Sequence, residues 1–434
     1  MPVARTLLVL TALAWPAAAA AQSIAGPFGG LFGRTPERTG REFTALDFRS
    51  AVGAQYDDAI LDDATPPNVA PVSGSTAGAN AGLTFERRRD RLRFNLRGGG
   101  TYQEFVREPS ISAVSYDAGG LMVARVATRL SLDASATYVR TPFYRLLPGY
   151  AGSVIPTPIP VPGEPFAARR LTTDTLQGSV GFTSPYTRRS TFSASVSHRQ
   201  TRFPENRLND LEGWAGHARW TRKMNRDLSA RAGYAREEVQ LSADAEGRFV
   251  HEMVDLGVDF LRELSVARRT SLSFDTQTSI IRHSGGERRY RLNGGAALVQ
   301  GFRRTWIGSM QVRRNTEFLP GFLAPVFTDQ AGIGLAGMLG SRIEWSSSAG
   351  ASRGEFGFDA DAGEFKTYSG AARLAAGLTR HLGVYVQYSY YKYDIPSGAS
   401  GLVVLPQLSR QAVTAGLSTW IPIFTRVREP RDPG

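Results

Sequence analysis

Hydrophobic and polar residues alternate along most of this 434-residue chain. In the segment 271–280, Leu272, Phe274 and Ile280 share one face of an extended chain, while serine, aspartate and glutamine residues share the other. Residues 250–260 repeat the same two-residue period. A period of two that lasts ten residues or more predicts β-strands. Such strands are long for a soluble sheet, whose strands average about five or six residues.

The alternating segments are joined by tight turns and wide loops in strict succession. Tight turns that carry arginine are expected at 87–91, 128–129, 186–190, 222–227, 265–269, 302–304, 341–342 and 379–381. Wider loops rich in glycine, proline and aspartate separate the other neighbours. The pattern predicts eighteen strands, at 43–56, 75–87, 91–105, 112–127, 129–141, 172–185, 190–202, 209–222, 227–240, 249–262, 269–282, 287–301, 304–316, 326–340, 342–356, 365–379, 382–394 and 409–424.

An even number of strands, with both termini and all tight turns on one side, is typical of a transmembrane β-barrel. The sequence therefore predicts an all-β fold, a single closed antiparallel transmembrane β-barrel of sixteen to eighteen strands. Its short turns would be periplasmic and its longer loops extracellular. A β-propeller is the competing fold, because outside the stretch with the proline-rich loop the tight turns lie about 36–42 residues apart, which overlaps the length of a blade. Each repeat here holds two long strands rather than four short ones, which favours the barrel.

The first residues of the chain predict export. Arg5 is followed by an apolar stretch at 7–15 and by the small residues Ala19 and Ala21, the pattern of a signal peptide and its cleavage site. The apolar stretch is shorter than the ~18 residues that a spanning helix requires. The predicted organisation is a signal peptide at 1–21, a periplasmic N-terminal segment at 22–42, the barrel at 43–424 and a periplasmic C-terminal tail at 425–434.

The composition supports the same class. The chain contains no cysteine, so its stability in an oxidising compartment must come from something other than disulfides. A closed barrel provides it, because every strand pairs with two neighbours and no edge is left open. Hydrophobic residues make up 42% of the chain, a moderate content that suits a barrel in which only every second strand residue meets lipid.

Aromatic residues gather near the predicted strand ends. Tyr186, Trp220, Trp306 and Trp345 lie within a few residues of tight turns. Near the opposite ends lie Tyr102, Phe105, Tyr138, Phe143, Tyr391 and Tyr393. Rings with a polar edge favour the headgroup level of a bilayer, so the sequence predicts two aromatic girdles.

The signal peptide, the alternation of turns and loops, and the final strand resemble Gram-negative outer-membrane barrels of the porin-like kind. Residues 414–424 are similar to the terminal signal that the barrel-assembly machinery reads, but Thr419 replaces a hydrophobic residue and ten residues follow Phe424. The motif Tyr56-Asp57-Asp58 resembles uncharacterised barrel families often encoded with exopolysaccharide systems. The resemblance implies location in the outer membrane, with membrane lipid, lipopolysaccharide and the barrel-assembly machinery as partners.

The charge bears on what the barrel carries. The formal net charge is +12, and the basic residues are almost all arginine. Strand alternation predicts twelve arginines on the inner face: Arg49, Arg91, Arg93, Arg97, Arg125, Arg199, Arg219, Arg231, Arg289, Arg291, Arg313 and Arg373. Eight acids are expected on the same face: Asp47, Glu86, Asp117, Asp133, Asp255, Asp259, Asp275 and Glu344. A pore lined by arginine favours anions, whereas arginines paired with these acids would form a structural network. Both interpretations stay open. No nucleic-acid partner is expected, because the chain has no basic cluster.

The longest predicted loop, 142–170, contains a proline-rich stretch with Pro156, Pro158, Pro160 and Pro162. Alternate prolines favour a stiff polyproline II conformation. This is the third outer loop, which in porins folds into the lumen and narrows it. The prolines are therefore candidates for a constriction loop, with display at the cell surface as the alternative.

Catalytic and metal-binding patterns are sparse. The chain has no cysteine that could act as a nucleophile. Ser195 and Ser197 lie near His198, but adjacent residues of a strand point to opposite faces, so Ser197 and His198 cannot form a nucleophile–base pair. His217 and His251 are the inward histidines. No enzyme activity, cofactor or metal is predicted.

Two functions remain from the sequence. The first is an outer-membrane channel for small polar or anionic solutes. The alternative is an exit duct for an acidic exopolysaccharide.

Overall fold

The computed structural model describes residues 42–60, 72–106, 112–142, 172–204, 210–241, 248–260, 262–263, 270–283, 286, 288–302, 305–319, 324–358, 364–394 and 407–428. The predicted signal peptide at 1–21, most of the predicted N-terminal segment and the proline-rich stretch lie outside these residues. Phe143 lies outside them as well.

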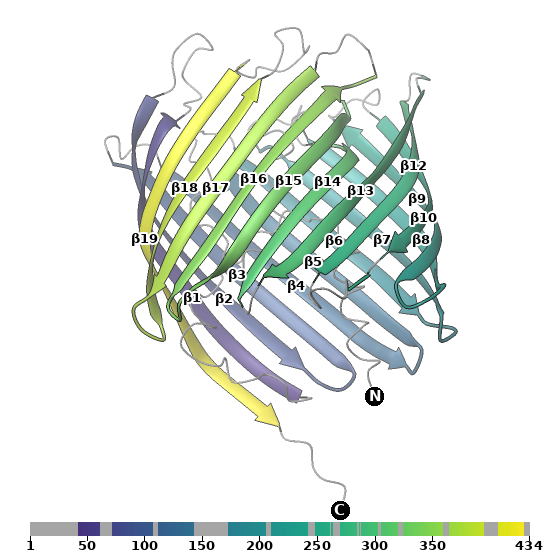
Figure 1. The fold of residues 1–434 in the computed structure, drawn as a ribbon, viewed down its shortest axis with the longest axis horizontal. Helices are drawn as coiled ribbons and strands as arrows, with labels where there is room; N and C mark the ends of the chain where they lie inside the picture. The colour runs from purple at the N-terminus through teal and green to yellow at the C-terminus, as the bar shows by residue number, and fades with distance from the viewer. Residues whose placement is uncertain are drawn as a thin grey trace, which may run out of the picture.

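The described residues form one antiparallel sheet that closes on itself (Figure 1). Its strands are β1 (Glu42–Ile60), β2 (Val72–Arg88), β3 (Leu92–Phe105), β4 (Ser112–Ala127), β5 (Leu130–Pro142), β6 (Thr172–Ser184), β7 (Ser190–Arg202), β8 (Leu211–Lys223), β9 (Leu228–Leu241), β10 (Arg248–Phe260), β11 (Arg262–Glu263), β12 (Thr270–His283), β13 (Arg288–Phe302), β14 (Trp306–Glu317), β15 (Val326–Leu339), β16 (Ile343–Phe356), β17 (Glu364–Gly377), β18 (Leu382–Asp394) and β19 (Gln407–Arg428).

The barrel has eighteen strand positions, as the sequence predicts. The two-residue β11 is a continuation of β10, since both pair with β12. Each long strand pairs with its neighbours in sequence, and β1 pairs with β19 to close the wall. Both ends of the described chain lie at the end of the barrel that holds the tight turns, opposite the loops (Figure 1).

The structure extends the two terminal strands beyond the predicted limits. β19 ends at Arg428 rather than at Phe424, because Thr425–Arg428 continue to pair with the first residues of β1. A register shift beside Leu46 inserts one extra residue on β19, which lets the ladder resume after the irregularity. The start of the predicted C-terminal tail is therefore wall strand.

Short side chains close several of the tight turns. Thr187 Oγ1 accepts hydrogen bonds from the backbone of Arg189 and Ser190, and Thr379 Oγ1 does the same in the turn before β18. Asn225 Oδ1 accepts hydrogen bonds from the backbone N–H groups of Asp227 and Leu228. Thr and Asn favour such turns because their side-chain oxygens reach the backbone two or three residues ahead. These local bonds explain why the strands reverse where the sequence predicts.

The two faces of the wall differ in chemistry. Outward side chains are apolar and exposed, with Leu256 67%, Leu292 60% and Ile333 58% accessible in the isolated chain. The inner face carries small and polar residues, and Asn80 and Gln387 on it are buried. An apolar outer face on a closed sheet suits lipid, because no backbone polar group is left at an open edge. Among the described residues, no helix is long and apolar enough to cross a membrane.

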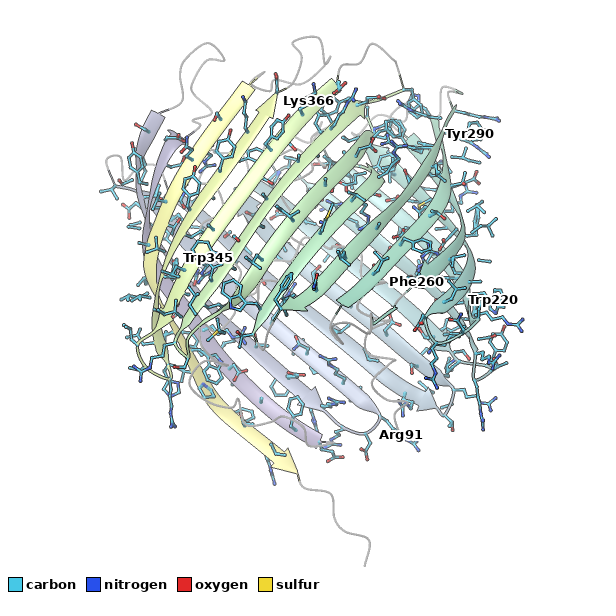
Figure 2. All side chains as sticks on the ribbon, viewed as in Figure 1. Arg91, Trp220, Phe260, Tyr290, Trp345 and Lys366 are labelled. Carbon is cyan, nitrogen blue, oxygen red and sulfur yellow. The ribbon has the colours of Figure 1, made fainter. Side chains whose placement is uncertain are left out.

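Aromatic residues mark both ends of the outer face, with two corrections. Trp220 donates to the hydroxyl of Tyr186 near the turns, and Tyr290 lies near the loop end (Figure 2). Phe105 and Tyr391 do not join the outer girdle that the sequence predicts. Both are buried, because their register places them on the inner face. Proximity to a strand end does not by itself determine the face.

One side chain spans the seam where the barrel closes. Tyr385 of β18 is only 2% exposed. A Cβ built on Gly416 of β19 would lie 2.7 Å from Tyr385 Oη, and one on Gly53 of β1 would lie 2.9 Å from it. The tyrosine therefore lies across two glycines, one from each strand of the seam. On its other side, the guanidinium carbon of Arg373 is 4.6 Å from the ring centroid.

Candidate functional site: the inner face of the barrel

The inner face is the part of the barrel that could contact a solute, and the pairing register identifies its residues. Eleven of the twelve predicted arginines occupy inner-face positions of strands: Arg49, Arg93, Arg97, Arg125, Arg199, Arg219, Arg231, Arg289, Arg291, Arg313 and Arg373. Arg91 is the exception, since it lies exposed in the turn between β2 and β3 rather than in a strand.

The strongest charge cluster lies in the turn-side half of β8–β12. Arg231 is buried and donates through Nε to Asp255 at 2.6 Å and through Nη1 to Asp259. Its third nitrogen donates to the carbonyl of Thr276 at 3.1 Å and lies 3.8 Å from Asp275. Arg219 reaches the other oxygen of Asp255 at 2.9 Å. Two arginines thus meet three aspartates, and none of the five residues is left as an isolated lumen charge.

This cluster occupies a break in the wall. The β10–β12 ladder ends at Val254 opposite Thr278, although β10 continues to Phe260. A Cβ on Gly257 would lie 3.0 Å from both the Arg231 guanidinium and the Thr276 carbonyl. The guanidinium therefore enters the space that Gly257 leaves and donates to a carbonyl beside the broken ladder. Unsatisfied backbone groups are costly within a bilayer, so Arg231 has a structural role here.

Two other inner arginines have acidic neighbours. Arg93 lies 3.8 Å from Glu86, with almost half of its side chain exposed. Arg199 is half-buried, and Glu237 and Glu317 are the acids whose charges act on it, without an ion pair in the described residues. Neither of these two acids was among the eight that the sequence placed inside. Both follow from the same alternation: Glu237 lies within β9, and Glu317 is the last residue of β14.

Sequence reasoning missed a further buried pair near the loop end. Arg410 of β19 binds Asp57 of β1 through two nitrogens, and Gln55 donates to the same carboxylate at 3.1 Å. Asp57 is fully buried. It belongs to the Tyr56-Asp57-Asp58 motif, but only the pairing of the first and last strands reveals its partner, 353 residues away in the chain.

A few inner cations have no acidic neighbour at bonding distance. Within the described part of the chain, Arg125 and Arg313 form no ion pair. Nε and Nη1 of Arg373 are buried and have no hydrogen-bond partner there, and Glu344 is the acid whose charge acts on it. Arg97 and Arg199 also form no ion pair in the described residues. The added acids Glu237 and Glu317 reduce the positive excess that the sequence suggests, whereas Asp57 is balanced by Arg410.

One nucleophile–base contact is present on the inner face. Ser195 Oγ lies 2.7 Å from His217 Nδ1, because the two residues are direct cross-strand partners. The nearest acid in the same row, Asp133, lies across Gly181 on the serine side. A catalytic triad needs the acid behind the histidine, where it orients the ring. The arrangement is that of a polar cross-strand pair.

The acidic residues of the described ranges do not assemble a cation site. No group of three or more His, Cys, Asp or Glu side chains with metal-binding geometry occurs among the residues that the structure describes.

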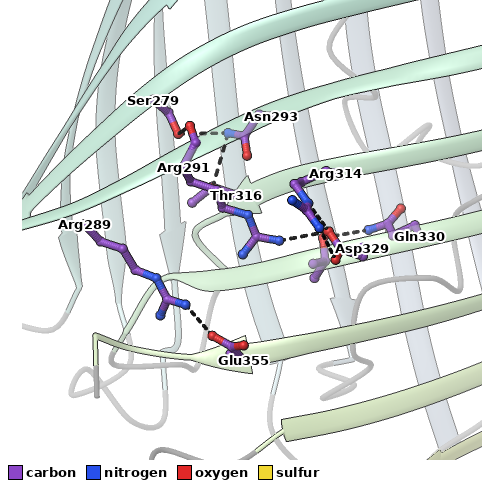
Figure 3. Close-up of polar contacts among 10 residues, drawn as sticks. Ser279, Arg289, Arg291, Asn293, Arg314, Thr316, Asp329, Gln330 and Glu355 are labelled. Carbon is purple, nitrogen blue, oxygen red and sulfur yellow. Dashed lines mark hydrogen bonds and ion pairs between the residues drawn. The ribbon is translucent and has the colours of Figure 1, made fainter. Parts of the chain in front are cut away.

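At the loop end, β13 makes contacts of a different kind. Arg291 lies 3.1 Å from Asp329, which also receives two hydrogen bonds from Arg314 at 2.6 and 2.8 Å. Arg289 pairs with Glu355 and donates to the carbonyl of Gly357 at 3.1 Å. Figure 3 shows both β13 arginines reaching across to these acids. Asp329 and Glu355 occupy outer-face positions of β15 and β16, so the wall is not a simple cylinder at this point.

Comparison with known proteins finds only distant likenesses to solved structures. No protein-family profile matches the chain, and no curated protein sequence matches it. The outer-membrane porin OpdQ of Pseudomonas aeruginosa aligns with a TM-score of 0.45 and 9% identity, over 88% of this chain and 98% of that chain. OccAB3 of Acinetobacter baumannii aligns at 0.46 and 9%, over 88% and 99%. The ferric enterobactin receptor PfeA of Pseudomonas aeruginosa aligns at 0.45 and 7%, over 87% and 82%. Likenesses this distant carry no argument about a solute.

Proposed function

We propose that this protein is an outer-membrane channel for small polar solutes, with a weak preference for anions. The observation that carries the proposal is the contrast between the two faces of a closed wall. The outer face presents Leu256, Leu292 and Ile333 to lipid, whereas the inner face carries polar and charged side chains such as Arg373, Gln387 and Asn80. A polar interior in a barrel of this size is typical of a water-filled pore.

The proposed anion preference depends on very few side chains. Most inner arginines face an acid, as Arg231 and Arg410 do, and a neutralised pair exerts little field on a passing ion. Five inner arginines have no bonded acid among the described residues: Arg97, Arg125, Arg199, Arg313 and Arg373. Their charge supports anion entry in the way that rings of arginine do in anion pores, but on a smaller scale.

An exit duct for an acidic polymer is less well supported. A polyanion in transit needs a continuous track of available cations, since each carboxylate must exchange one arginine for the next. The arginines of β8–β13 are engaged with aspartate and glutamate, which interrupts such a track. A small solute needs only a polar passage, so the channel is the function that we propose.

Planar bilayer recordings test the proposal directly. The purified protein should insert and conduct, and a salt gradient should give a reversal potential of anion-selective sign. The preference should fall at high salt, because mobile ions screen exposed charges beyond ~3 Å at 1 M. Replacing Arg125 and Arg313 by Gln should reduce the preference, while Arg93→Gln, which removes a cation already beside Glu86, should change it less. A non-conducting protein would end the channel proposal, and a cation-selective one would end its anionic part.

A further inference from the structure

We infer that the lumen is narrowed by the wall itself, at the loop-side ends of β14–β16. Residues 314–318, 326–329 and 353–358, called here the inner flap, lie on the inner side of β10–β13 instead of continuing the cylinder. The inference deepens the proposed channel function, because it assigns the element that limits solute size. The effect on transport rests on that proposed function, whereas the position of the flap inside the wall does not.

The first line of evidence is a break in the β13–β14 ladder. Pairing runs from Phe302 opposite Trp306 to Gly294 opposite Arg314. Beyond this rung β13 continues to Arg288 with β12 as its partner, and β14 continues with β15. No further β13–β14 rung occurs in the described ranges. The two halves of the wall therefore separate over their loop-side ends.

Gly294 marks the point of separation. Its φ is +151°, a conformation that residues with a side chain rarely adopt. A Cβ at this position would lie only 2.3 Å from the carbonyl oxygen of Asp275 on β12. The chain turns sharply against its neighbour here, and only glycine fits. The backbone thus directs the loop-side end of β13 away from β14.

The second line of evidence is that inner-face residues contact outer-face residues. Strand alternation places Arg291 on the inner face of β13 and Asp329 on the outer face of β15, yet they form an ion pair at 3.1 Å. Asn293 on the inner face of β13 also donates to Thr316 of β14, at 3.4 Å. In a simple cylinder these faces point in opposite directions. They can meet only if the ends of β14–β16 lie inside β13.

The third line of evidence is an apolar cluster between the two layers. Phe327, which alternation places on the outer face of β15, is completely buried. The Arg289 guanidinium lies 4.2 Å from its ring centroid. Phe249, on the inner face of β10, packs against Phe318 at 5.8 Å and Phe358 at 6.1 Å between centroids. Leu211, Val239, Leu241 and Ile281 complete the cluster from the inner faces of β8, β9 and β12.

The flap therefore occupies space that an open barrel would leave to solvent. It covers the inner face of β8–β13 near the loops with aromatic side chains, so a polar solute must pass along the remaining wall. Two ion pairs join the flap to β13, one between Arg289 and Glu355 and one between Arg291 and Asp329. The size limit of the channel is accordingly assigned to wall strands. The proline-rich loop 142–170 stays a separate candidate.

The absence of cysteine allows a direct test of where the flap lies. Single cysteines are introduced as Phe327→Cys and Ile333→Cys, two outer-face positions of β15. The protein is reconstituted in phosphatidylcholine vesicles and treated with a lipid-soluble maleimide. Position 333, 58% exposed, should react freely. Position 327 should react at least about tenfold more slowly, because the flap must open first. Equal rates in folded, heat-modifiable protein would overturn the inference.

A disulfide crosslink gives a second test, which stays informative if the Phe327→Cys variant does not fold. Asn293→Cys with Thr316→Cys should form a disulfide on mild oxidation, since the native side chains are in hydrogen-bond contact. Failure of this pair to crosslink in folded protein would also count against the flap.

Conductance tests the constriction. Arg289→Gln with Arg291→Gln should loosen the flap and raise single-channel conductance. The control is Arg93→Gln, which removes an inner-face arginine from an ion pair with Glu86 away from the flap and should not raise it. Equal conductance in wild type and the double variant would overturn the constriction. If no form conducts while position 327 stays protected, the channel proposal fails and the flap alone stands.

Discussion

The seam between the last and first strands gives the sharpest prediction about stability. Tyr385→Ala removes the ring that lies across Gly416 and Gly53 and beneath Arg373. Replacing a buried aromatic residue by alanine costs about 3–5 kcal/mol. The loss of the contact between Arg373 and the ring adds about 1 kcal/mol. A free energy of unfolding lower by at least about 3 kcal/mol is expected, because the flanking glycines have no side chains that could fill the space.

Urea titration of the barrel refolded in detergent micelles measures this difference. With a slope of about 1–3 kcal/mol per molar urea, the midpoint should fall by at least about 1 M. Tyr385→Phe is the matched control, since it keeps the ring and the stacked guanidinium. It should retain most of the stability. If Tyr385→Ala unfolds within about 0.5 kcal/mol of the wild type, the ring does not stabilise the seam.

Three other substitutions, one of them with a matched control, probe the wall by the same titration. Arg231→Ala should lower the free energy of unfolding by about 3–5 kcal/mol, because it removes a buried guanidinium from Asp255, Asp259 and the carbonyl of Thr276. Arg93→Ala, at a half-exposed pair, should lower it by less than about 1 kcal/mol; similar values for the two would contradict the structural role of Arg231. Leu256→Arg places a cation on the lipid face and should destabilise by about 2–4 kcal/mol; a neutral effect would mean that this face does not meet lipid. Gly294→Val should destabilise by at least about 1–3 kcal/mol through backbone strain, and normal stability would argue against the sharp turn at the ladder break.

The sequence was sufficient to predict the strands, because alternation and turn chemistry are local signals. The predicted limits 112–127, 190–202 and 382–394 agree with β4, β7 and β18 at both ends. Alternation also assigned the face of each strand arginine, since one register error would have moved a whole strand to the opposite face. The terminal strands were underestimated because their extension depends on pairing between residues at the two ends of the chain.

Partners across strands could not be predicted in this way. Arg410 with Asp57, and Ser195 with His217, depend on register, which is set by the whole ladder rather than by any local motif. The flap was missed for a different reason. Phe327, Asp329 and Glu355 fit the alternation of a lipid-facing strand, but two of the three are acids. Acidic residues on an otherwise apolar face were the available signal that the loop-side ends of these strands leave the lipid.

The two breaks in the wall share one physical solution. The β10–β12 ladder fails near the turns and the β13–β14 ladder fails near the loops, and each break is occupied by arginine from the inner face. A guanidinium is suited to this position because it offers several donors in one plane and stays charged beside carboxylates. The inner-face arginines of β8, β9 and β13 are therefore engaged in ion pairs and hydrogen bonds that stabilise the wall. Any selectivity of the proposed channel must come from the few inner arginines elsewhere, so removing Arg125 and Arg313 should alter ion preference more than stability, and removing Arg231 should do the reverse.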